Sequence, residues 1–186
     1  MTPQVEPLIT VAELDCLPDD GNRYELIEGE LFVSTAPGLP HQRVAGNLYF
    51  SLRSHLKENP SGEVILTPGV IFSEYSAVIP DLVYVNNDRA QGIIANNRFV
   101  AAPDLVIEIV SPGKENEDRD RVVKRQAYGK YGVKEYWIVD PQQRTVEVYR
   151  LKGRTLRLTE QLSQADELRS TLLPGYRCQV ASLFSP

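Results

Sequence analysis

The sequence predicts a single α/β domain over residues 1–186, because amphipathic helical segments alternate with β-rich segments along the chain. The chain has the length of one ordinary domain, and it contains no internal repeat, low-complexity tract or linker. From the N-terminus we expect a hairpin, a helix, three β-rich stretches, a second long helix and further strands.

The N-terminal part predicts a short helix, a hairpin and a long helix. Thr10 followed by Glu13 is the pattern of a capping box, which opens a helix. Residues 24–34 are typical of two short strands that pivot at Gly29. In residues 41–57 apolar side chains recur every four positions, which predicts a helix with one buried stripe. The stripe consists of Val44, Leu48, Leu52 and Leu56.

The middle of the chain is rich in β-branched residues. Three β-rich stretches occupy residues 63–73, 77–85 and 104–110. They could form an antiparallel meander, with a polar loop around residues 86–99. Residues 116–131 predict a charged amphipathic helix that Gly132 stops. Strand character returns at 135–140 and 145–151, and the last 30 residues resemble a short β-rich closing segment.

The charge balance limits the partners of this chain. Twenty Lys and Arg residues against 25 Asp and Glu residues give a net charge of −5, which disfavours tight, sequence-independent binding to a polyanion. Any role with nucleic acid must therefore rely on a local basic patch. Residues 114–125 mix both signs, which is typical of a solvated helix face.

Cysteine usage and hydropathy predict a cytoplasmic protein. Cys16 and Cys178 lie far apart in the sequence and form no zinc-type cluster, so we interpret them as reduced thiols. The N-terminal residues lack a basic region followed by an apolar one, and no window approaches the length of a membrane span. We therefore expect no membrane partner.

Two acidic residues lie inside apolar, β-rich segments. They are Asp81 in AVIPDLVYV and Glu108 in PDLVIEIVSP. A carboxylate in such a run costs several kcal/mol to desolvate unless it is paired, hydrogen-bonded or bound to a cation. Antiparallel pairing of the two strands could bring both carboxylates within reach of one cation. Hard oxygen ligands of this kind suit Mg²⁺ or Mn²⁺, and such a site can activate water for phosphodiester hydrolysis.

Strand geometry predicts which way Glu108 faces. Side chains two apart share a face, so Asp104, Val106, Glu108 and Val110 project one way along this strand. The intervening Leu105, Ile107 and Ile109 project the other way. Glu108 thus faces away from its most apolar neighbours.

Several strings, in order, carry a family resemblance. They are YELIEGEL, PDLVYV, APDLVIEIVSP and GVKEYWIVDP, with His41 just before a helix and Asp120, Lys124 and Tyr128 spaced along another. Pro80-Asp81, then Glu108, then a lysine-bearing helix resembles the PD-(D/E)XK nuclease superfamily. More closely, the chain is similar, from about residue 22 to 150, to the Uma-two family of bacterial restriction-endonuclease-like proteins.

The resemblance implies a restriction-endonuclease-like core, an α/β (α+β) fold in which helices flank a mixed central β-sheet with an N-terminal β-hairpin. It implies that Asp81 and Glu108 hold the metal, Mg²⁺ or Mn²⁺, with the backbone carbonyl of Ile109 as a further ligand. The superfamily lysine would fall at Val110, so Lys124 is expected to replace it from the following helix. Its role would be to orient or deprotonate the attacking water, or to stabilise charge on the phosphoryl oxygens.

Five further residues are possible supporting contacts. They are Glu28, His41, Asp104, Asp120 and Tyr128. Simpler roles compete with these functional ones. Asp81 could cap a turn or accept a backbone hydrogen bond, and Asp104 could be the ligand in its place. Glu108 could pair with an arginine, Lys124 could form an i,i+4 ion pair with Asp120, and His41 could be a hydrogen-bonding residue at a helix start.

Two functions fit these residues. The first is a metal-dependent endonuclease that hydrolyses DNA phosphodiester bonds and works as a homodimer, because cutting two strands needs two sites. The second is a catalytically silent protein of the nuclease fold that serves as a binding module or assembly subunit. The acidic net charge and Val110 favour the second.

Overall fold

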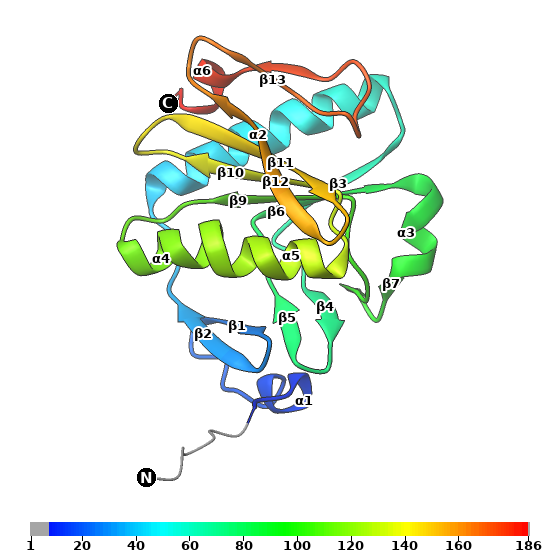
Figure 1. Cartoon of the computed structure of the whole chain (residues 1–186), viewed down its shortest axis with the longest axis vertical. Coiled ribbons are helices and arrows are strands. Elements are labelled where there is room, and N and C mark those ends of the chain that lie inside the picture. Colours follow the sequence, from blue (N-terminus) through cyan, green and yellow to red (C-terminus); the bar gives the residue numbers. More distant parts are fainter. Residues whose placement is uncertain (1–7, 186) are drawn as a thin grey trace.

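The computed structural model describes residues 8–185, without the side chain of Glu115 (Figure 1). Its helices are α1 (Val11–Leu14), α2 (Leu39–Glu58), α3 (Asn87–Ile93), α4 (Lys114–Asp118), the π-helical η1 (Arg119–Lys124), α5 (Arg125–Tyr131) and α6 (Val180–Leu183). Its strands are β1 (Arg23–Ile27), β2 (Glu30–Ser34), β3 (Gly62–Leu66), β4 (Val70–Ser73), β5 (Ser76–Val78), β6 (Leu82–Asn86), β7 (Ile94–Ala95), β8 (Arg98–Phe99), β9 (Leu105–Ile109), β10 (Glu135–Asp140), β11 (Thr145–Lys152), β12 (Thr155–Leu162), β13 (Glu167–Arg169) and β14 (Arg177–Gln179).

The central sheet is mixed, as expected. Its strand order is β12-β11-β10-β9-β6-β3, with β9 and β10 parallel and the other neighbouring pairs antiparallel. Two parallel strands need a long crossover connection, and here α4, η1 and α5 provide it. These three consecutive elements, residues 114–131, are called the crossover helix. The predicted α/β class, with helices on a mixed sheet, is therefore confirmed.

A second sheet contains the N-terminal hairpin. Its order is β2-β1-β5-β4-β8-β7, and it lies below the central sheet in Figure 1. The predicted hairpin is confirmed as β1 and β2. The predicted meander is only partly correct: β3, β6 and β9 are antiparallel neighbours, but residues 63–73 divide between the two sheets. Gly69 and Pro68 break this stretch, so that β4 leaves the central sheet.

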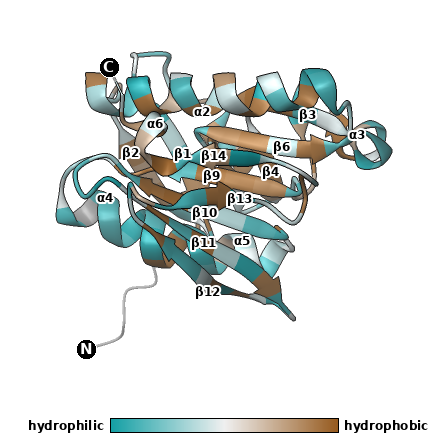
Figure 2. Cartoon of the chain, turned by 90° about the horizontal axis from the view of Figure 1, so that it is seen from above, coloured by the Kyte–Doolittle hydropathy of each residue, from teal (hydrophilic) through white to brown (hydrophobic). Residues whose placement is uncertain are grey.

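The central sheet is covered on both faces (Figure 2). The predicted stripe of α2 is buried, and it packs on one face together with Leu105, Ile107 and Ile109. The other face, with Val106, packs under the crossover helix. The alternation predicted for β9 is thus confirmed, and Glu108 is buried beneath that helix.

Four local predictions have clear outcomes. The capping box of Thr10 and Glu13 is present, and Gly132 ends α5 with a left-handed backbone, φ 93°. The polar loop expected at 86–99 is wrong, because Asn86 caps α3 and two short strands follow. The closing segment is β-rich as predicted, but it also contains α6.

Within residues 8–185 no helix combines the length and apolar character that crossing a membrane requires.

Candidate active site

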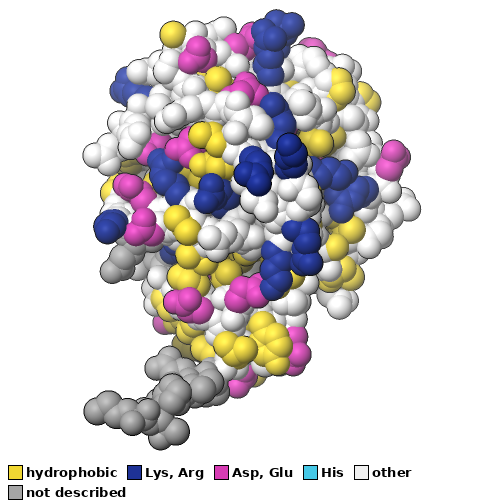
Figure 3. Space-filling view, viewed as in Figure 1, with side chains coloured by type: hydrophobic (Ala, Val, Ile, Leu, Met, Phe, Trp, Pro, Cys, Tyr) yellow, Lys and Arg dark blue, Asp and Glu magenta, His cyan; other side chains and the backbone are white. Residues whose placement is uncertain are grey.

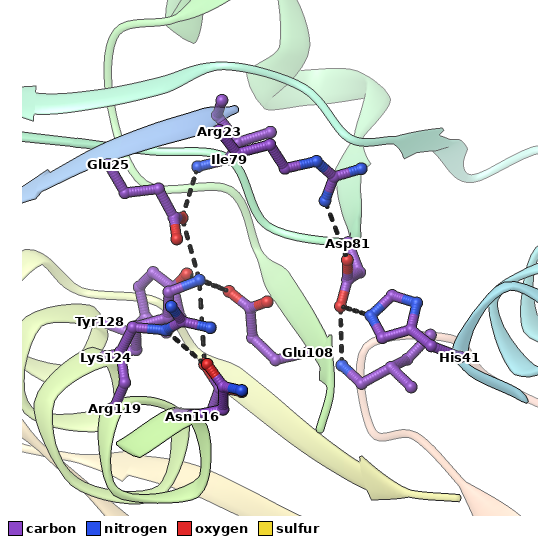
Figure 4. A network of polar contacts seen from close by, with 12 residues as sticks. Arg23, Glu25, His41, Ile79, Asp81, Glu108, Asn116, Arg119, Lys124 and Tyr128 are labelled. Carbon is purple, nitrogen blue, oxygen red and sulfur yellow. Dashed lines mark hydrogen bonds and ion pairs between the residues drawn. The ribbon is translucent and has the colours of Figure 1, made fainter. Parts of the chain in front are cut away.

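The pairing of β6 with β9 places Asp81 beside Glu108. The two strands are antiparallel with Leu82 opposite Ile107, so one further step of the register sets Asp81 opposite Glu108. Figure 4 shows both carboxylates turned toward one space between the central sheet and the crossover helix. The antiparallel arrangement expected from the sequence is present.

Asp81 is held by three neighbours. Its Oδ2 lies 2.9 Å from His41 Nε2 and accepts a hydrogen bond of 2.8 Å from the backbone N–H of Ile109. Its Oδ1 lies 3.6 Å from a guanidinium nitrogen of Arg23. Burial raises the pKa of Asp81, but the hydrogen bonds and positive charges outweigh burial and lower that pKa. The carboxylate is therefore ionised and fixed in direction.

Glu108 and Lys124 form a buried ion pair. The Lys124 Nζ lies 3.0 Å from Glu108 Oε1 and 2.9 Å from an oxygen of Glu25. The Tyr128 hydroxyl donates a 2.5 Å hydrogen bond to the same Glu108 oxygen. Lys124 is 2% exposed and Glu108 is 3% exposed, so water screens this pair little.

The pKa values of Glu108 and Lys124 are both raised, but for different reasons. Burial, with the nearby Asp81 and Asp120 charges, raises the pKa of Glu108 to about 8, although Lys124 opposes this. Burial alone would lower the pKa of Lys124, but Glu108, Glu25 and Asp120 raise it above its ordinary value. The cluster therefore holds an ammonium group and has an excess of acidic groups around it.

The π-helical turn η1 brings Lys124 and Asp120 to the same side. Its wider backbone interrupts the α-helical register between α4 and α5, and such turns occur frequently at functional sites. Lys124 Nζ lies 3.9 Å from Asp120 Oδ1, and Arg119 Nε lies 3.5 Å from the same oxygen. The i,i+4 pair expected between Lys124 and Asp120 is present, but it is buried and belongs to the larger cluster.

These side chains line a cavity of about 420 Å³. Its walls are β1, the segment before α2, the ends of β6 and β9, and the crossover helix. Among the predicted residues, those that line it are Asp81, Glu108, Ile109, Lys124, His41 and Asp120. Tyr128 is fully buried and reaches the cluster only through its hydroxyl.

Two predicted residues lie elsewhere. Asp104 shares the face of Glu108 but sits at the other end of β9, where it pairs with Arg89 at 2.6 Å and Lys134 at 2.7 Å. Glu28 contacts Lys130 and Tyr131 outside the cavity. The structure brings neither side chain to Asp81.

Two cavity residues on β1 are missing from the sequence prediction. Arg23 and Glu25 lie two residues apart on β1 and therefore share the face that points to the cavity. Glu25 also accepts a 2.8 Å hydrogen bond from the Ile79 amide. The signal that could have found them is the charged pair at i and i+2 in RYELI. The residue predicted from this string, Glu28, lies beyond the end of the strand.

The cavity offers oxygen donors of the kind that a divalent cation needs. Within the described residues no three His, Cys, Asp or Glu side chains form a ready metal cage. Mg²⁺ does not require one, because it is held by one or two carboxylates and keeps several waters. Asp81 Oδ1 and Glu108 Oε2 accept no hydrogen bond from the described residues, so both oxygens are available at the cavity.

Comparison with known proteins bears out the resemblance. The family model Uma2, described as "Putative restriction endonuclease", matches residues 11–181. A crystal structure described as a putative nuclease belonging to DUF820, from Anabaena variabilis ATCC 29413, is 23% identical with a TM-score of 0.75. The match covers 95% of this chain and 97% of that chain, and at this identity it shows the shared fold. No curated protein matches. Because the family model spans most of the sequence, this chain belongs to the Uma2 family of restriction-endonuclease-like proteins.

Proposed function

We propose that this protein is an endonuclease that hydrolyses DNA phosphodiester bonds with the help of Mg²⁺ or Mn²⁺. One observation carries the proposal: two carboxylates from adjacent strands and a lysine from the crossover helix share one cavity. Asp81 and Glu108 supply the carboxylates, and Lys124 supplies the ammonium group. Membership of a family described as "Putative restriction endonuclease" supports the same reaction class.

Asp81, Glu108 and the backbone carbonyl of Ile109 would hold the cation. Asp81 is suited to this role because His41 and the Ile109 amide fix its Oδ2 and leave Oδ1 toward the cavity. Glu108 has an equivalent arrangement, since Lys124 and Tyr128 occupy Oε1. When bound, the cation supplies Lewis-acid stabilisation of phosphoryl oxygens and lowers the pKa of a bound water.

Lys124 would stabilise negative charge in the transition state. Hydrolysis forms a bond from a water oxygen to phosphorus and breaks the bond to the leaving sugar oxygen. The attacking water loses a proton to solvent and the leaving oxygen takes one up, while negative charge grows on the phosphoryl oxygens. The carboxylates of Glu25 and Glu108 keep Lys124 protonated, so its ammonium group can stabilise that charge. A fully protonated lysine is poorly suited to remove a proton from water.

A protein with a single cavity would have to bind a duplex twice to cut both strands. We therefore also propose a homodimer with one cavity per subunit. Sedimentation velocity of the purified chain tests this directly. A single species with the mass of one chain at micromolar concentration would contradict it.

The test of the proposed function is calorimetric titration of Mn²⁺, followed by incubation with supercoiled plasmid. The wild type is compared with the Asp81→Asn, Glu108→Gln variant. The Glu63→Gln, Glu74→Gln variant is the matched control, because both of its side chains are exposed and neither lines the cavity. We expect binding and nicking in the wild type and the control, and neither in the site variant.

Two other outcomes would contradict parts of this proposal. Binding of Mn²⁺ without any nicking would favour the silent binding module over the nuclease. Equal binding isotherms for the wild type and the site variant would remove Asp81 and Glu108 from the metal site.

A further inference from the structure

Positive charge in this acidic chain is concentrated in two short segments. Residues 121–134 and 148–159 hold nine of the 20 Lys and Arg residues and none of the 25 Asp and Glu residues. The rest of the chain therefore carries every acidic residue against eleven basic ones. Segregation of this kind can give a basic surface to a protein whose net charge is −5.

The fold packs these two segments against each other. The first contains α5 and the second contains most of β12, and the backbones approach closely at Gly129. A β-carbon there would lie 3.0 Å from the Leu156 amide nitrogen and 3.1 Å from the Arg154 carbonyl oxygen. The absence of a side chain at Gly129 allows this close approach, which brings the basic residues of both segments to one surface.

Three arginines line a groove at this contact. A cavity between α5 and β12 is lined by Arg125, Arg154 and Arg157, and its other lining residues are uncharged. Figure 3 shows Lys and Arg side chains distributed across this face of the molecule, on which α5 and β12 lie. We call Arg125, Arg154 and Arg157 the arginine groove.

The guanidinium groups of the arginine groove lack acidic partners within the described residues. Arg125 lies over the Tyr149 ring at 5.4 Å, and Arg154 donates a 3.4 Å hydrogen bond to the Lys130 carbonyl. In contrast, the nearby Arg121 and Arg150 are each paired with two carboxylates. The arginine groove therefore keeps its charge available to a ligand.

We propose that the arginine groove binds the phosphate backbone of duplex DNA, a proposal that rests on the nuclease function above. Arginine forks match phosphate oxygens, and a row of unpaired guanidiniums matches the repeated charge of a DNA strand. The position agrees with this role, because Arg125 directly follows Lys124 on one continuous helix. Lys124 lines the cavity and Arg125 lines the groove. One helix thus contributes to both the cavity and the groove.

The test is fluorescence anisotropy of a labelled duplex of mixed sequence, measured with EDTA so that binding is separated from cleavage. The Arg125→Gln, Arg154→Gln, Arg157→Gln variant is compared with the wild type. The matched control is Arg53→Gln, Arg169→Gln, Arg177→Gln, which changes the net charge equally with exposed residues of α2, β13 and β14. Arg154→Gln, Arg157→Gln provides a second variant that changes only exposed side chains.

We expect the groove variant to weaken DNA binding at least tenfold while the control changes it less than twofold. The slope of log Kd against log salt should fall by roughly 0.9 for each phosphate contact removed. Equal affinities of the groove variant and the control would overturn the proposal. Poly-L-glutamate that displaces DNA as effectively as an unlabelled duplex of equal charge would also overturn it, and would indicate an acidic protein partner.

Plasmid nicking in Mg²⁺ separates this proposal from the nuclease function. Arginine-dependent DNA binding without nicking would refute the nuclease and retain the groove. Nicking by the wild type with unchanged binding in the groove variant would refute the groove and retain the nuclease.

Discussion

The ammonium nitrogen of Lys124 lies 3.0 Å from Oε1 of Glu108, although 16 residues separate them in the chain. In the PD-(D/E)XK pattern that the sequence resembles, a lysine would occupy position 110, two residues after the glutamate. Here Val110 is 5% exposed in the apolar core beneath the crossover helix. The helix that follows the strand folds back on it, so the lysine reaches the same glutamate from a different element.

Lys124→Met should abolish nicking and leave metal binding in place. Methionine keeps much of the side-chain volume but removes the positive charge, so Glu108 and Glu25 lose their shared partner. We expect a loss of at least about 100-fold in plasmid nicking. Calorimetry should show Mn²⁺ affinity equal to that of the wild type or higher, because less positive charge then competes for Glu108. Removing one partner of a buried ion pair should also cost about 3–5 kcal/mol in free energy of unfolding.

Nicking by Lys124→Met at the wild-type rate would contradict the role of this lysine. Lys130→Met is the control, because that lysine lies on the same crossover helix and pairs with the exposed Glu28.

His41→Ala should weaken metal binding without removing a ligand. His41 Nε2 lies 2.9 Å from Asp81 Oδ2, and both side chains are buried. Loss of such an outer partner typically costs about 10–100-fold in metal affinity. Calorimetric titration of Mn²⁺ measures this, and His55→Ala on the same helix is the control. An unchanged affinity in His41→Ala would show that Ile109 and Arg23 suffice to orient Asp81.

Asp104→Asn should reduce stability in a way that depends on pH. Burial raises the pKa of Asp104, but the Asn86 amide, Lys134 and Arg89 outweigh burial and lower it. A lowered pKa in the folded state stabilises the fold above the ordinary aspartate pKa, near 4, and the contribution is lost as pH falls through the folded value. We expect the variant to cost about 1–3 kcal/mol at neutral pH.

Urea unfolding of the wild type and Asp104→Asn from pH 7 to pH 3 measures this difference. The gap in free energy should be constant near neutrality and shrink below about pH 4. A gap that widens as the pH falls would contradict the assigned ion pairs.

Alanine substitutions at two glycines should change the stability of the protein in opposite directions. Gly46 is exposed within α2 and a β-carbon there meets nothing within 4 Å, so Gly46→Ala should stabilise by about 1 kcal/mol. At Gly62 a β-carbon would lie 2.1 Å from the Val85 carbonyl oxygen and 2.7 Å from the Tyr84 ring, so Gly62→Ala should destabilise by about 1–3 kcal/mol. Urea unfolding midpoints of the two variants test both signs, and equal midpoints would contradict this packing.

Much of the fold follows from local sequence patterns. The four-residue apolar repeat of α2, the capping box of α1 and the two-residue alternation of β9 each correspond to an observed element. These signals are local because capping and amphipathicity depend on residues within one or two turns. The loop expected at 86–99 is wrong for a related reason. Its polar composition is typical of a loop, but the Asn86 side chain caps the N-terminus of α3 there.

The amino-acid sequence predicts which residues are costly to bury: carboxylates in apolar strands, at Asp81 and Glu108, and a lysine on a helix. The three-dimensional fold adds the contacts of Lys124 with Glu108 and Glu25, the separate cluster of Asp104, and the place of Arg23 and Glu25 in the cavity. These contacts depend on the crossover between β9 and β10. Contacts between elements distant in the chain depend on strand order and helix docking, which the packing of the whole core determines and no short segment specifies.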